Sequence, residues 1–462
     1  MKYVSTRGQA PVLDFADVLL TGLAADGGLY VPESWPALPD RWDEPRPYAG
    51  LAAEVLWPYV DGSPVSRADL DRMVAEAYAT FDHPDVCPLV EIEPGLFVVE
   101  LFHGPTLAFK DVALQLVGRL FDHELSRRGE RATIVVATSG DTGSAAIAAC
   151  VGRPALDIVV LHPAGRVSDV QRRQMTTVDA PNVHNVAIEG TFDDCQDLVK
   201  ALFADADLRD RIGLSAMNSI NWARVAAQVV YYVAATAAVG PCDVAVPTGN
   251  FGNVFAGWIA RRSGAPIDRL IIGSNRNDIL TRWARTGDLV QEGVVPTLSP
   301  SMDIQVSSNH ERLLFELLGR DGAATARLMT RFRELGAVEA PRDPAFVAAS
   351  LDDRATLELI ADLRRRTGYL ADPHTAVGIG AALACGEGAG AGSGRGGAAV
   401  PVVCLATAHP AKFPDAVEKA TGVRPALPGH LADLHERPER YEVLPADVAA
   451  VRAHVEGCVA GR

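Results

Sequence analysis

Short apolar runs alternate with longer amphipathic stretches along most of the chain beyond residue 85. The apolar runs occupy residues 97–102, 133–138, 157–163, 183–190, 243–250, 271–275 and 401–407. Near-continuous apolar strands that are separated by helices are typical of parallel sheets covered on both faces. The pattern therefore predicts an α/β protein with open, mostly parallel sheets.

The domain organisation follows from where this pattern begins and from the length of the chain. Residues 1–85 show helical patterns and a turn-rich passage, DGGLYVPESWP, which predict a mainly helical N-terminal region. A chain of 462 residues is too long for one ordinary core. We expect a larger α/β domain from residues 86–130 and 241–462, with a smaller α/β domain, 131–240, inserted between its parts. The glycine-rich segment 386–396 is interpreted as a flexible surface loop without chemistry.

Charge and cysteine content exclude several classes of function. A net charge of −15 argues against a broad nucleic-acid interface, although an anion pocket remains compatible with it. The longest apolar stretch, 225–240, contains Gln228 and is short for a membrane span, so it predicts a buried helix. The seven cysteines are scattered and show no C-x-x-C spacing, which disfavours a disulfide framework or a zinc cluster. We expect a cytoplasmic monomer or homodimer without a metal, a nucleic-acid partner or a membrane partner.

Lys110 lies at a predicted junction between a loop and a helix, within HGPTLAFKD. Apolar neighbours and a helix N-terminus both disfavour the ammonium form, which is how a lysine becomes nucleophilic near neutral pH. The alternative is a solvated lysine in a first helical turn. Only five of the 43 Lys and Arg residues are lysines, so surface charge is usually supplied by arginine, and this favours a chemical role.

The segment PTGNFGN, residues 247–253, joins a predicted strand to a predicted helix. Gly249 and Gly252 would let backbone N–H groups converge on an anion at the helix N-terminus, which predicts a phosphate site. A plain glycine-rich turn explains the segment equally well. It matches neither G-x-G-x-x-G nor the P-loop pattern, which disfavours dinucleotide and nucleoside-triphosphate binding.

Three further segments offer polar groups at strand or helix ends. ATSGDTGSAA could bind a carboxylate, or Ser139 or Asp141 could simply cap a helix. MNSINWAR could bind phosphate through Asn218, Ser219 and Arg224, or form a capped helix with a surface arginine. LATAHPAKF places Thr407 at a strand end, where open α/β sheets bind ligands, or in a helix N-terminal turn.

Two other segments are given structural interpretations. Ser308 and Glu311 have the spacing of a capping box. His374 lies beside a proline turn, without an identifiable metal partner.

Together and in this order, the segments resemble the threonine synthases, in the longer form of bacteria and fungi. The resemblance rests on YVSTRG, GLAADGGLYVPE, HGPTLAFKD, TSGDTGSAA, GRVSDVQRRQMTT, GTFDDCQ, NSIN, PTGNFGN, SMDI and ATAHPAKF. It implies a pyridoxal-phosphate enzyme of fold type II, the tryptophan-synthase-β-like group. It also implies the conversion of O-phospho-L-homoserine and water to L-threonine and phosphate.

The resemblance assigns roles to individual positions. Lys110 would hold the cofactor as a Schiff base, and Thr407 would hydrogen-bond the pyridine nitrogen. Asp141 stands where the shorter plant-like synthases have an asparagine that bonds the cofactor's phenolic oxygen; an aspartate would need a proton or a protonated partner to do so. The cofactor phosphate would lie at Gly249, Asn250, Phe251, Gly252 and Asn253, the substrate carboxylate at Ser139, Gly140 and Thr142, and the substrate phosphate at Asn218, Ser219 and Arg224.

Several rival functions remain. A phospho-lyase of the same family, which releases 2-oxobutyrate, would use the same motifs. Threonine dehydratases and cysteine synthases would not need Ser219 and Arg224 and do not share the N-terminal segments. A non-catalytic nucleotide- or anion-binding protein with two glycine-rich loops would give Lys110 no role.

Overall fold

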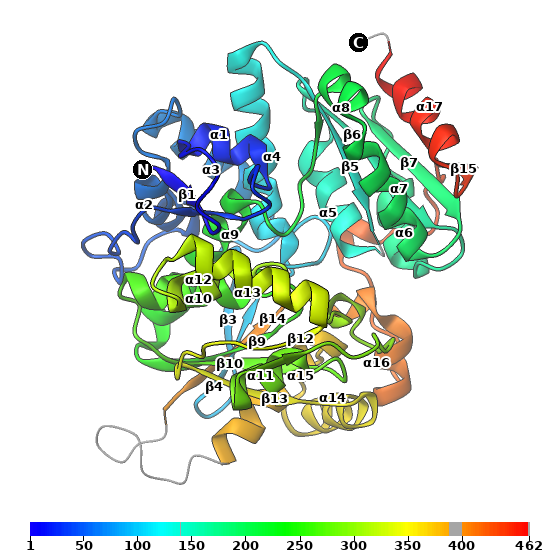
Figure 1. Ribbon diagram of the computed structural model, residues 1–462. Helices are drawn as coiled ribbons and strands as arrows, with labels where there is room; N and C mark the ends of the chain where they lie inside the picture. The colour runs from blue at the N-terminus through cyan, green and yellow to red at the C-terminus, as the bar shows by residue number, and fades with distance from the viewer. Residues whose placement is uncertain (139, 388–399, 461–462) are drawn as a thin grey trace.

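The N-terminal region is mainly helical, as expected from its sequence. The computed structural model describes residues 1–138, 140–387 and 400–460. Strands β1 (Tyr3–Ser5) and β2 (Tyr30–Pro32) form a small antiparallel sheet beside α1 (Phe15–Thr21), α2 (Tyr48–Val60) and α3 (Arg67–Tyr78). These elements, in blue in Figure 1, pack on α4 (Lys110–Arg128) and α9 (Trp222–Val239). The stretch predicted as a buried helix is α9, and most of its side chains are buried.

The larger sheet has six strands in the order β13-β10-β9-β14-β4-β3. All neighbours are parallel except β3 and β4, which are antiparallel. The strands are β3 (Leu89–Glu93), β4 (Leu96–Glu100), β9 (Cys242–Pro247), β10 (Ile267–Ser274), β13 (Phe346–Ser350) and β14 (Val402–Ala406). The predicted α/β class with mostly parallel sheets is confirmed.

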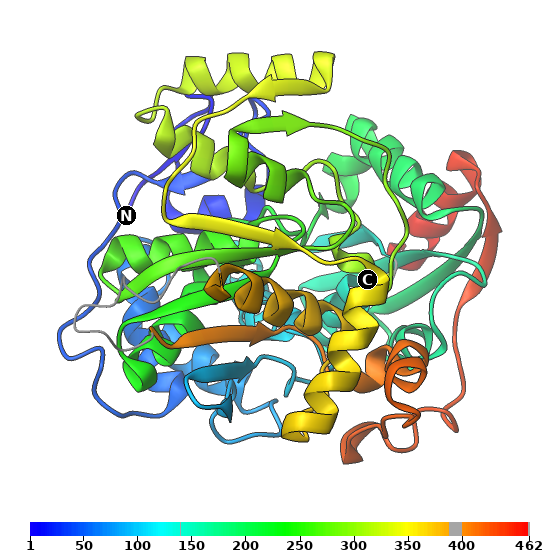
Figure 2. The ribbon, with the colours of Figure 1, turned by 90° about the horizontal axis from the view of Figure 1, so that it is seen from below.

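Helices cover both faces of this sheet because alternate side chains of a strand point to opposite faces. Val244 and Val246 join the core that contains α10 (Gly252–Ser263), whereas Ala245 between them joins the core of α14 (Asp353–Thr367) and α15 (Pro373–Glu387). Figure 2 shows α14 and α15 on the near side of the strands. The near-continuous apolar sequence of β9 follows from this double burial.

The smaller sheet is parallel and has the order β15-β7-β6-β5-β8. Its strands are β5 (Ala132–Ala137), β6 (Leu156–Pro163), β7 (Val183–Glu189), β8 (Leu214–Ser215) and β15 (Glu442–Pro445). One face packs on α5 (Asp141–Cys150) and the other on α7 (Phe192–Ala204), α8 (Ala206–Ile212) and α17 (Val448–Val459). The remaining elements are α6 (Asp169–Thr176), α11 (Ile279–Thr286), β11 (Asp288–Val290), η1 (Pro300–Met302), α12 (His310–Leu317), α13 (Gly322–Leu335), β12 (Ala337–Glu339), η2 (Pro410–Lys412), α16 (Pro414–Thr421) and η3 (Gly429–Leu431).

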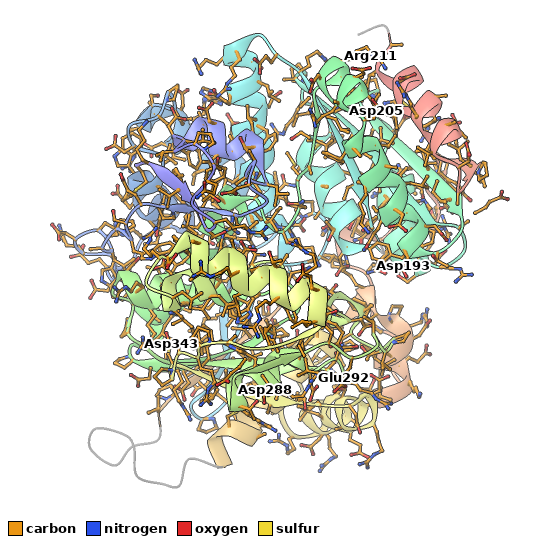
Figure 3. The ribbon with its side chains drawn as sticks, in the orientation of Figure 1. Asp193, Asp205, Arg211, Asp288, Glu292 and Asp343 are labelled. Atoms are coloured by element: carbon orange, nitrogen blue, oxygen red, sulfur yellow. The ribbon has the colours of Figure 1, made fainter. Side chains whose placement is uncertain are left out.

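The end of the chain corrects the expected domain boundary. We expected all of 241–462 to belong to the larger domain, but β15 pairs in parallel with β7, and α17 packs on α7. In Figure 1 the C-terminal helix, in red, lies beside the smaller sheet. Ion pairs join Arg452 to Asp205 and Glu456 to Arg211; Figure 3 labels Asp205 and Arg211 near this helix. β15 has only four residues, with Val443 and Leu444 as its aliphatic side chains, and this stretch is too short to have shown the pairing from sequence.

Two further expectations concern a membrane-spanning helix and the glycine-rich segment. None of the described helices has both the length and the apolar character that crossing a bilayer would require. The glycine-rich segment lies, for the most part, outside the described residues, since 388–399 are not among them.

The packing of α17 on the smaller sheet can be tested with two valines of this helix. Val451 is fully buried and Val448 is 44% exposed. We expect Val451→Ala to lower the stability by about 1–3 kcal/mol, because two buried methyl groups and their contacts are lost. Val448→Ala should change it by less than about 0.5 kcal/mol. Urea unfolding followed by circular dichroism measures both; equal effects would contradict the packing.

Candidate active site

Three neighbouring strands of the larger sheet bring the predicted site segments together. The segments that contain Lys110, Thr407 and Gly249 follow the carboxyl ends of β4, β14 and β9, which lie side by side. The backbone N–H of Phe109 donates to the Thr407 carbonyl at 2.9 Å, which fixes the start of α4 against the end of β14. Ligands of open α/β sheets bind at this edge, and the strand order explains why distant segments meet there.

Lys110 is the first residue of α4, and its side chain is buried. Its Nζ lies 3.2 Å from Asp141 Oδ2. Burial lowers the pKa of Lys110 from its ordinary value, and the positive charges of Arg224 and Lys412 lower it further, whereas Asp141 opposes the shift. The direction agrees with the expectation of a lysine that loses its proton readily.

Asp141 begins α5, at the carboxyl end of β5, and links the two sheets. Its Oδ1 lies 3.0 Å from Lys412 Nζ and accepts a hydrogen bond from Gln171 Nε2 at 2.8 Å. Burial would raise the pKa of this carboxyl, but the charges of Lys110 and Lys412 outweigh it and hold the pKa well below its usual range. Asp141 is therefore a carboxylate with protonated partners.

The segment 247–253 forms a tight cradle at the N-terminus of α10. A Cβ atom at Gly249 would lie 2.5 Å from the backbone oxygen of Ser301, so no side chain fits there. Phe251 adopts a φ of 65°, a strained value for a bulky residue. The first N–H groups of a helix have no partner within the helix, and residues 250–253 line the cavity at this helix start. This geometry suits an anion and favours the phosphate interpretation over a plain turn.

Arg224 lies inside α9, 3% exposed, and not at the surface. Its Nε and Nη1 atoms have no hydrogen-bond partner within the described parts of the chain. Burial lowers the pKa of Arg224 to about 10. A buried cation without a counter-charge is costly, so an anionic ligand here would relieve an existing electrostatic penalty. The alternative of a surface arginine is wrong.

The two candidate anion sites touch each other. Asn309 Nδ2 donates to the carbonyls of Ser219 at 3.0 Å and Asn250 at 3.1 Å. The Ser308 hydroxyl donates to Asn250 Oδ1 at 3.2 Å and lies 3.4 Å from the Ser219 hydroxyl.

The side chain of Asn253 has one unused donor. Its Nδ2 is buried without a partner among the described residues, while its Oδ1 accepts a hydrogen bond from the Tyr231 hydroxyl at 2.5 Å.

A cavity of about 330 Å³ joins these features, with a wall drawn from both sheets and α9. Gly140 and Gly249 do not line it, and the Gly140 N–H already donates to Thr138 Oγ1 at 2.9 Å. Ser139 lies outside the described residues. The predicted residues that line the cavity are Lys110, Asp141, Thr142, Asn218, Ser219, Arg224, Asn250, Phe251, Gly252, Asn253 and Thr407.

Several functional neighbours were missed from the sequence. His374 lines the cavity; its Nδ1 lies 2.7 Å from Asp372 and its Nε2 accepts from the Ser301 N–H at 3.3 Å. The Asp372-Pro-His374 spacing was available, but nothing local placed it against Ser301. Lys412 could have been suspected, because lysine is rare in this chain. No group of three or more His, Cys, Asp or Glu suited to a metal occurs in the described ranges.

The predicted capping box at Ser308 and Glu311 is wrong. α12 begins at His310, with Asn309 before it and no side-chain cap. Glu311 instead forms an ion pair with Arg7 at 2.9 Å, which ties the N-terminal region to this helix. In this segment Ser308 therefore contacts Asn250 of the candidate site, and Glu311 contacts the N-terminal region.

The residues present fit pyridoxal phosphate. A buried amine of lowered pKa faces the cavity, and an anion cradle with an unpaired Asn253 amide lies on the same cavity wall. Thr407, at the end of β14, is buried beside them. Lys110, Gly249 to Asn253 and Thr407 would hold the group, and Asp141 would face it as a carboxylate.

Comparisons with known proteins agree along the whole chain. Family models match as threonine synthase N terminus over 2–78, pyridoxal-phosphate dependent enzyme over 86–407, and threonine synthase, C-terminal, over 375–455. The threonine synthase of Pseudomonas aeruginosa is 52% identical, with 98% of each chain covered. The structure of pyridoxal-phosphate-bound threonine synthase from Brucella melitensis is 49% identical, has a TM-score of 0.94 and is covered completely, as is this chain.

A more distant structure shows that the likeness holds as identity falls. The yeast threonine synthase structure is 34% identical and has a TM-score of 0.93, with 100% of this chain and 99% of that chain covered. The likeness includes the N-terminal region and the C-terminal segment, and it is not confined to the cofactor-binding fold. This chain is a pyridoxal-phosphate enzyme and belongs to the threonine synthase family.

Proposed function

We propose that the enzyme converts O-phospho-L-homoserine and water to L-threonine and phosphate in the cavity between the two sheets. The observation that carries the proposal is that the buried Lys110 amine and the buried Arg224 side chain, whose Nε and Nη1 have no partner among the described residues, line the same cavity. A reactive amine and a separate anion anchor are what a phosphorylated amino-acid substrate requires beyond the cofactor. The function is a carbon-oxygen lyase activity in threonine biosynthesis.

Bound pyridoxal phosphate supplies an aldehyde that condenses with amines and a conjugated ring that withdraws electrons from the carbon next to the nitrogen. The segment 249–253 would hold its phosphate at the N-terminus of α10, and Thr407 would hydrogen-bond its ring nitrogen. A hydroxyl partner does not force a proton onto that nitrogen, so positioned donors around the site must carry more of the charge stabilisation.

Lys110 has two tasks in this scheme. After it is released from the cofactor, its Nζ takes the proton at the substrate Cα and then moves a proton at Cβ. Burial lowers the pKa of Lys110, which makes its neutral amine more accessible than that of an ordinary lysine. Phosphate would leave from Cγ, which would regain the proton taken from Cβ. Water would then add its hydroxyl at Cβ, Cα would regain its proton, and the second proton of the water would go to the released phosphate.

The substrate is anchored at both ends. Thr142, in the first turn of α5, and Ser139 would meet the substrate carboxylate at a helix N-terminus; Gly140 would contribute through its backbone only if it gave up its bond to Thr138. Asn218, Ser219 and Arg224 would hold the substrate phosphate. We also propose a cytoplasmic location, which is supported by the absence of any disulfide among the seven cysteines.

The identity of the cofactor-bearing lysine can be tested by chemical trapping. Borohydride reduction of the yellow enzyme should fix the cofactor to the peptide that contains Lys110. Lys110→Ala should fold but lose turnover by several orders of magnitude, because it removes both the attachment point and the base. Lys200→Ala, at an exposed lysine, is the control and should keep full activity. Peptide mass spectrometry that places the label on Lys412 would refute the assignment.

The substrate phosphate site can be tested at Arg224. Arg224→Ala should lower kcat/KM for O-phosphohomoserine roughly ten- to hundredfold, because a charge-assisted contact worth about 1.5–3 kcal/mol is lost. Activity toward unphosphorylated homoserine should be poor in both proteins, and it should not fall further in the variant. The visible absorbance of the cofactor should persist, and Arg209→Ala, at an exposed arginine, should match the parent.

The Arg224 result has two informative alternatives. Unchanged kinetics with O-phosphohomoserine would move the substrate phosphate elsewhere. Loss of the cofactor absorbance would show that Arg224 and the 249–253 cradle have been assigned the wrong way round.

The reaction outcome decides between the synthase and its phospho-lyase rival. With O-phosphohomoserine, the enzyme should form L-threonine and inorganic phosphate in equal amounts, because water adds at Cβ before the product is released. Chromatography of the amino acid and a phosphate assay measure this ratio. Phosphate accompanied by 2-oxobutyrate, with little threonine, would contradict the proposed reaction while leaving the assignment of the cofactor site intact.

A further inference from the structure

A second lysine lies on the far side of Asp141 from Lys110. Lys412 ends η2, directly after β14, and is completely buried. Its Nζ lies 3.0 Å from Asp141 Oδ1, and Lys110 Nζ lies 3.2 Å from Asp141 Oδ2. One carboxylate therefore stands between two amines, and the reaction described above uses only one of them.

The two amines differ in their hydrogen bonds. Lys412 Nζ donates to the Thr106 carbonyl at 2.7 Å and to Gln174 Oε1 at 3.0 Å, in addition to its contact with Asp141. The contact with Asp141 is an ion pair, so one carboxylate and two neutral acceptors surround this amine, an arrangement that suits an ammonium group. Within the described chain, Lys110 Nζ has Asp141 as its acceptor, and it lies 5.0 Å from the centre of the Phe109 ring. Lys412 therefore has more polar contacts to hold an ammonium in place than Lys110 has among the described residues.

This difference matters because Asp141 is deeply buried. A buried carboxylate that loses its counter-charge becomes strongly unfavourable. Gln171 Nε2 and the Ser301 hydroxyl, 3.3 Å from Oδ2, supply hydrogen bonds to Asp141 but no charge. His374 also faces the carboxylate and is paired with its own partner, Asp372. When Lys110 becomes neutral, Lys412 is the remaining lysine that neutralises Asp141.

We propose that Lys412 is a positioning residue: its ammonium keeps Asp141 ionised and paired, so that Lys110 can release and regain a proton without leaving an unbalanced buried charge. The proposal rests on the function proposed above, in which Lys110 is the cofactor lysine and the base. Lys412 acts through Asp141 and does not touch the reacting atoms. In this arrangement Asp141 accepts hydrogen bonds, and it needs no proton of its own.

Three variants test this in the cofactor-loaded enzyme: Lys412→Met, Asp141→Asn and the double variant. The pH dependence of the visible spectrum reports the proton on the Lys110 nitrogen. In Lys412→Met, Lys110 is the one lysine that remains beside Asp141, so the protonated form of the Lys110 nitrogen is stabilised. The midpoint of the spectral change should therefore rise by about one pH unit or more, which corresponds to a tenfold higher proton affinity. The double variant removes both charges and should return the midpoint toward that of the parent. Lys200→Met, at the exposed lysine, should leave the spectrum unchanged.

Two outcomes would overturn the proposal. One is a Lys412→Met enzyme that binds the cofactor with an unshifted midpoint. The other is a shift that persists in the double variant, since Lys412 would then act without Asp141. Threonine formation is measured separately, so an enzyme that makes threonine with an unshifted midpoint refutes this inference alone, and failure to make threonine refutes the proposed function.

A measurement on the parent enzyme covers the case in which Lys412→Met does not fold. The chain has five lysines, so selective ¹³Cε-lysine labelling gives a simple NMR spectrum in which Lys412 is assigned from a Lys412→Arg sample. The Lys412 signal should keep its ammonium position throughout the pH range over which the visible spectrum changes. A Lys412 signal that titrates together with the spectrum would overturn the proposal.

Discussion

The carboxylate of Asp141 is buried between the Nζ atoms of Lys110 and Lys412, and these three side chains belong to three different segments. Asp141 follows β5 of the smaller sheet, whereas Lys110 and Lys412 follow β4 and β14 of the larger sheet. Removal of one partner from such a buried ion group costs about 3–5 kcal/mol, because the remaining charge stays desolvated. The relative position of the two sheets at the cavity is therefore constrained by charge balance, and not by apolar packing alone.

The active-site segments are locally unfavourable, and the surrounding fold holds them in place. Leu107 and Phe251 have φ values of 62° and 65°, and each such conformation costs on the order of 1–3 kcal/mol in a bulky residue. Arg224 is buried without a partner in the described structure. The strain at Leu107 is held by the bond from the His409 N–H to its carbonyl, at 3.0 Å. The large apolar cores on both faces of the larger sheet offset the cost of the strained backbone and of the buried arginine. Proteins commonly carry such local costs at functional sites and compensate for them in the surrounding fold.

Under the proposed function, the closeness of the two candidate anion sites would affect how the cofactor phosphate and the substrate phosphate are told apart. The segment around Ser219 and the 249–253 cradle contact each other through Asn309 and Ser308. Two phosphate groups in one cavity would repel each other unless cationic or N–H donors lay close to each. Arg224 contributes a full charge on one side, and the α10 N-terminus contributes partial charges on the other. The charged side chain of Arg224 and the backbone N–H groups at the start of α10 would thus serve different phosphate groups.

Much of this protein could be predicted from sequence because the relevant signals are local. The apolar run of β9 and the positions of Lys110 and Phe251 at loop-helix junctions depend on neighbouring residues, and both were confirmed. The placement of β15 on the smaller sheet could not be predicted in this way, because its pairing uses backbone groups and its side chains are mostly exposed.

Lys412 and His374 were missed for a related reason. Their proximity to Asp141 exists only in the folded chain, where η2 and the start of α15 meet the start of α5, and no spacing in the sequence encodes a distance across two sheets. The same holds for the burial of Arg224, because the sequence left open whether this helical arginine lies at the surface or faces a ligand site. The sequence by itself determined the fold class and the chemistry of individual segments, whereas the charge balance of the site was decided by tertiary packing, which alone sets burial and the distances between charges.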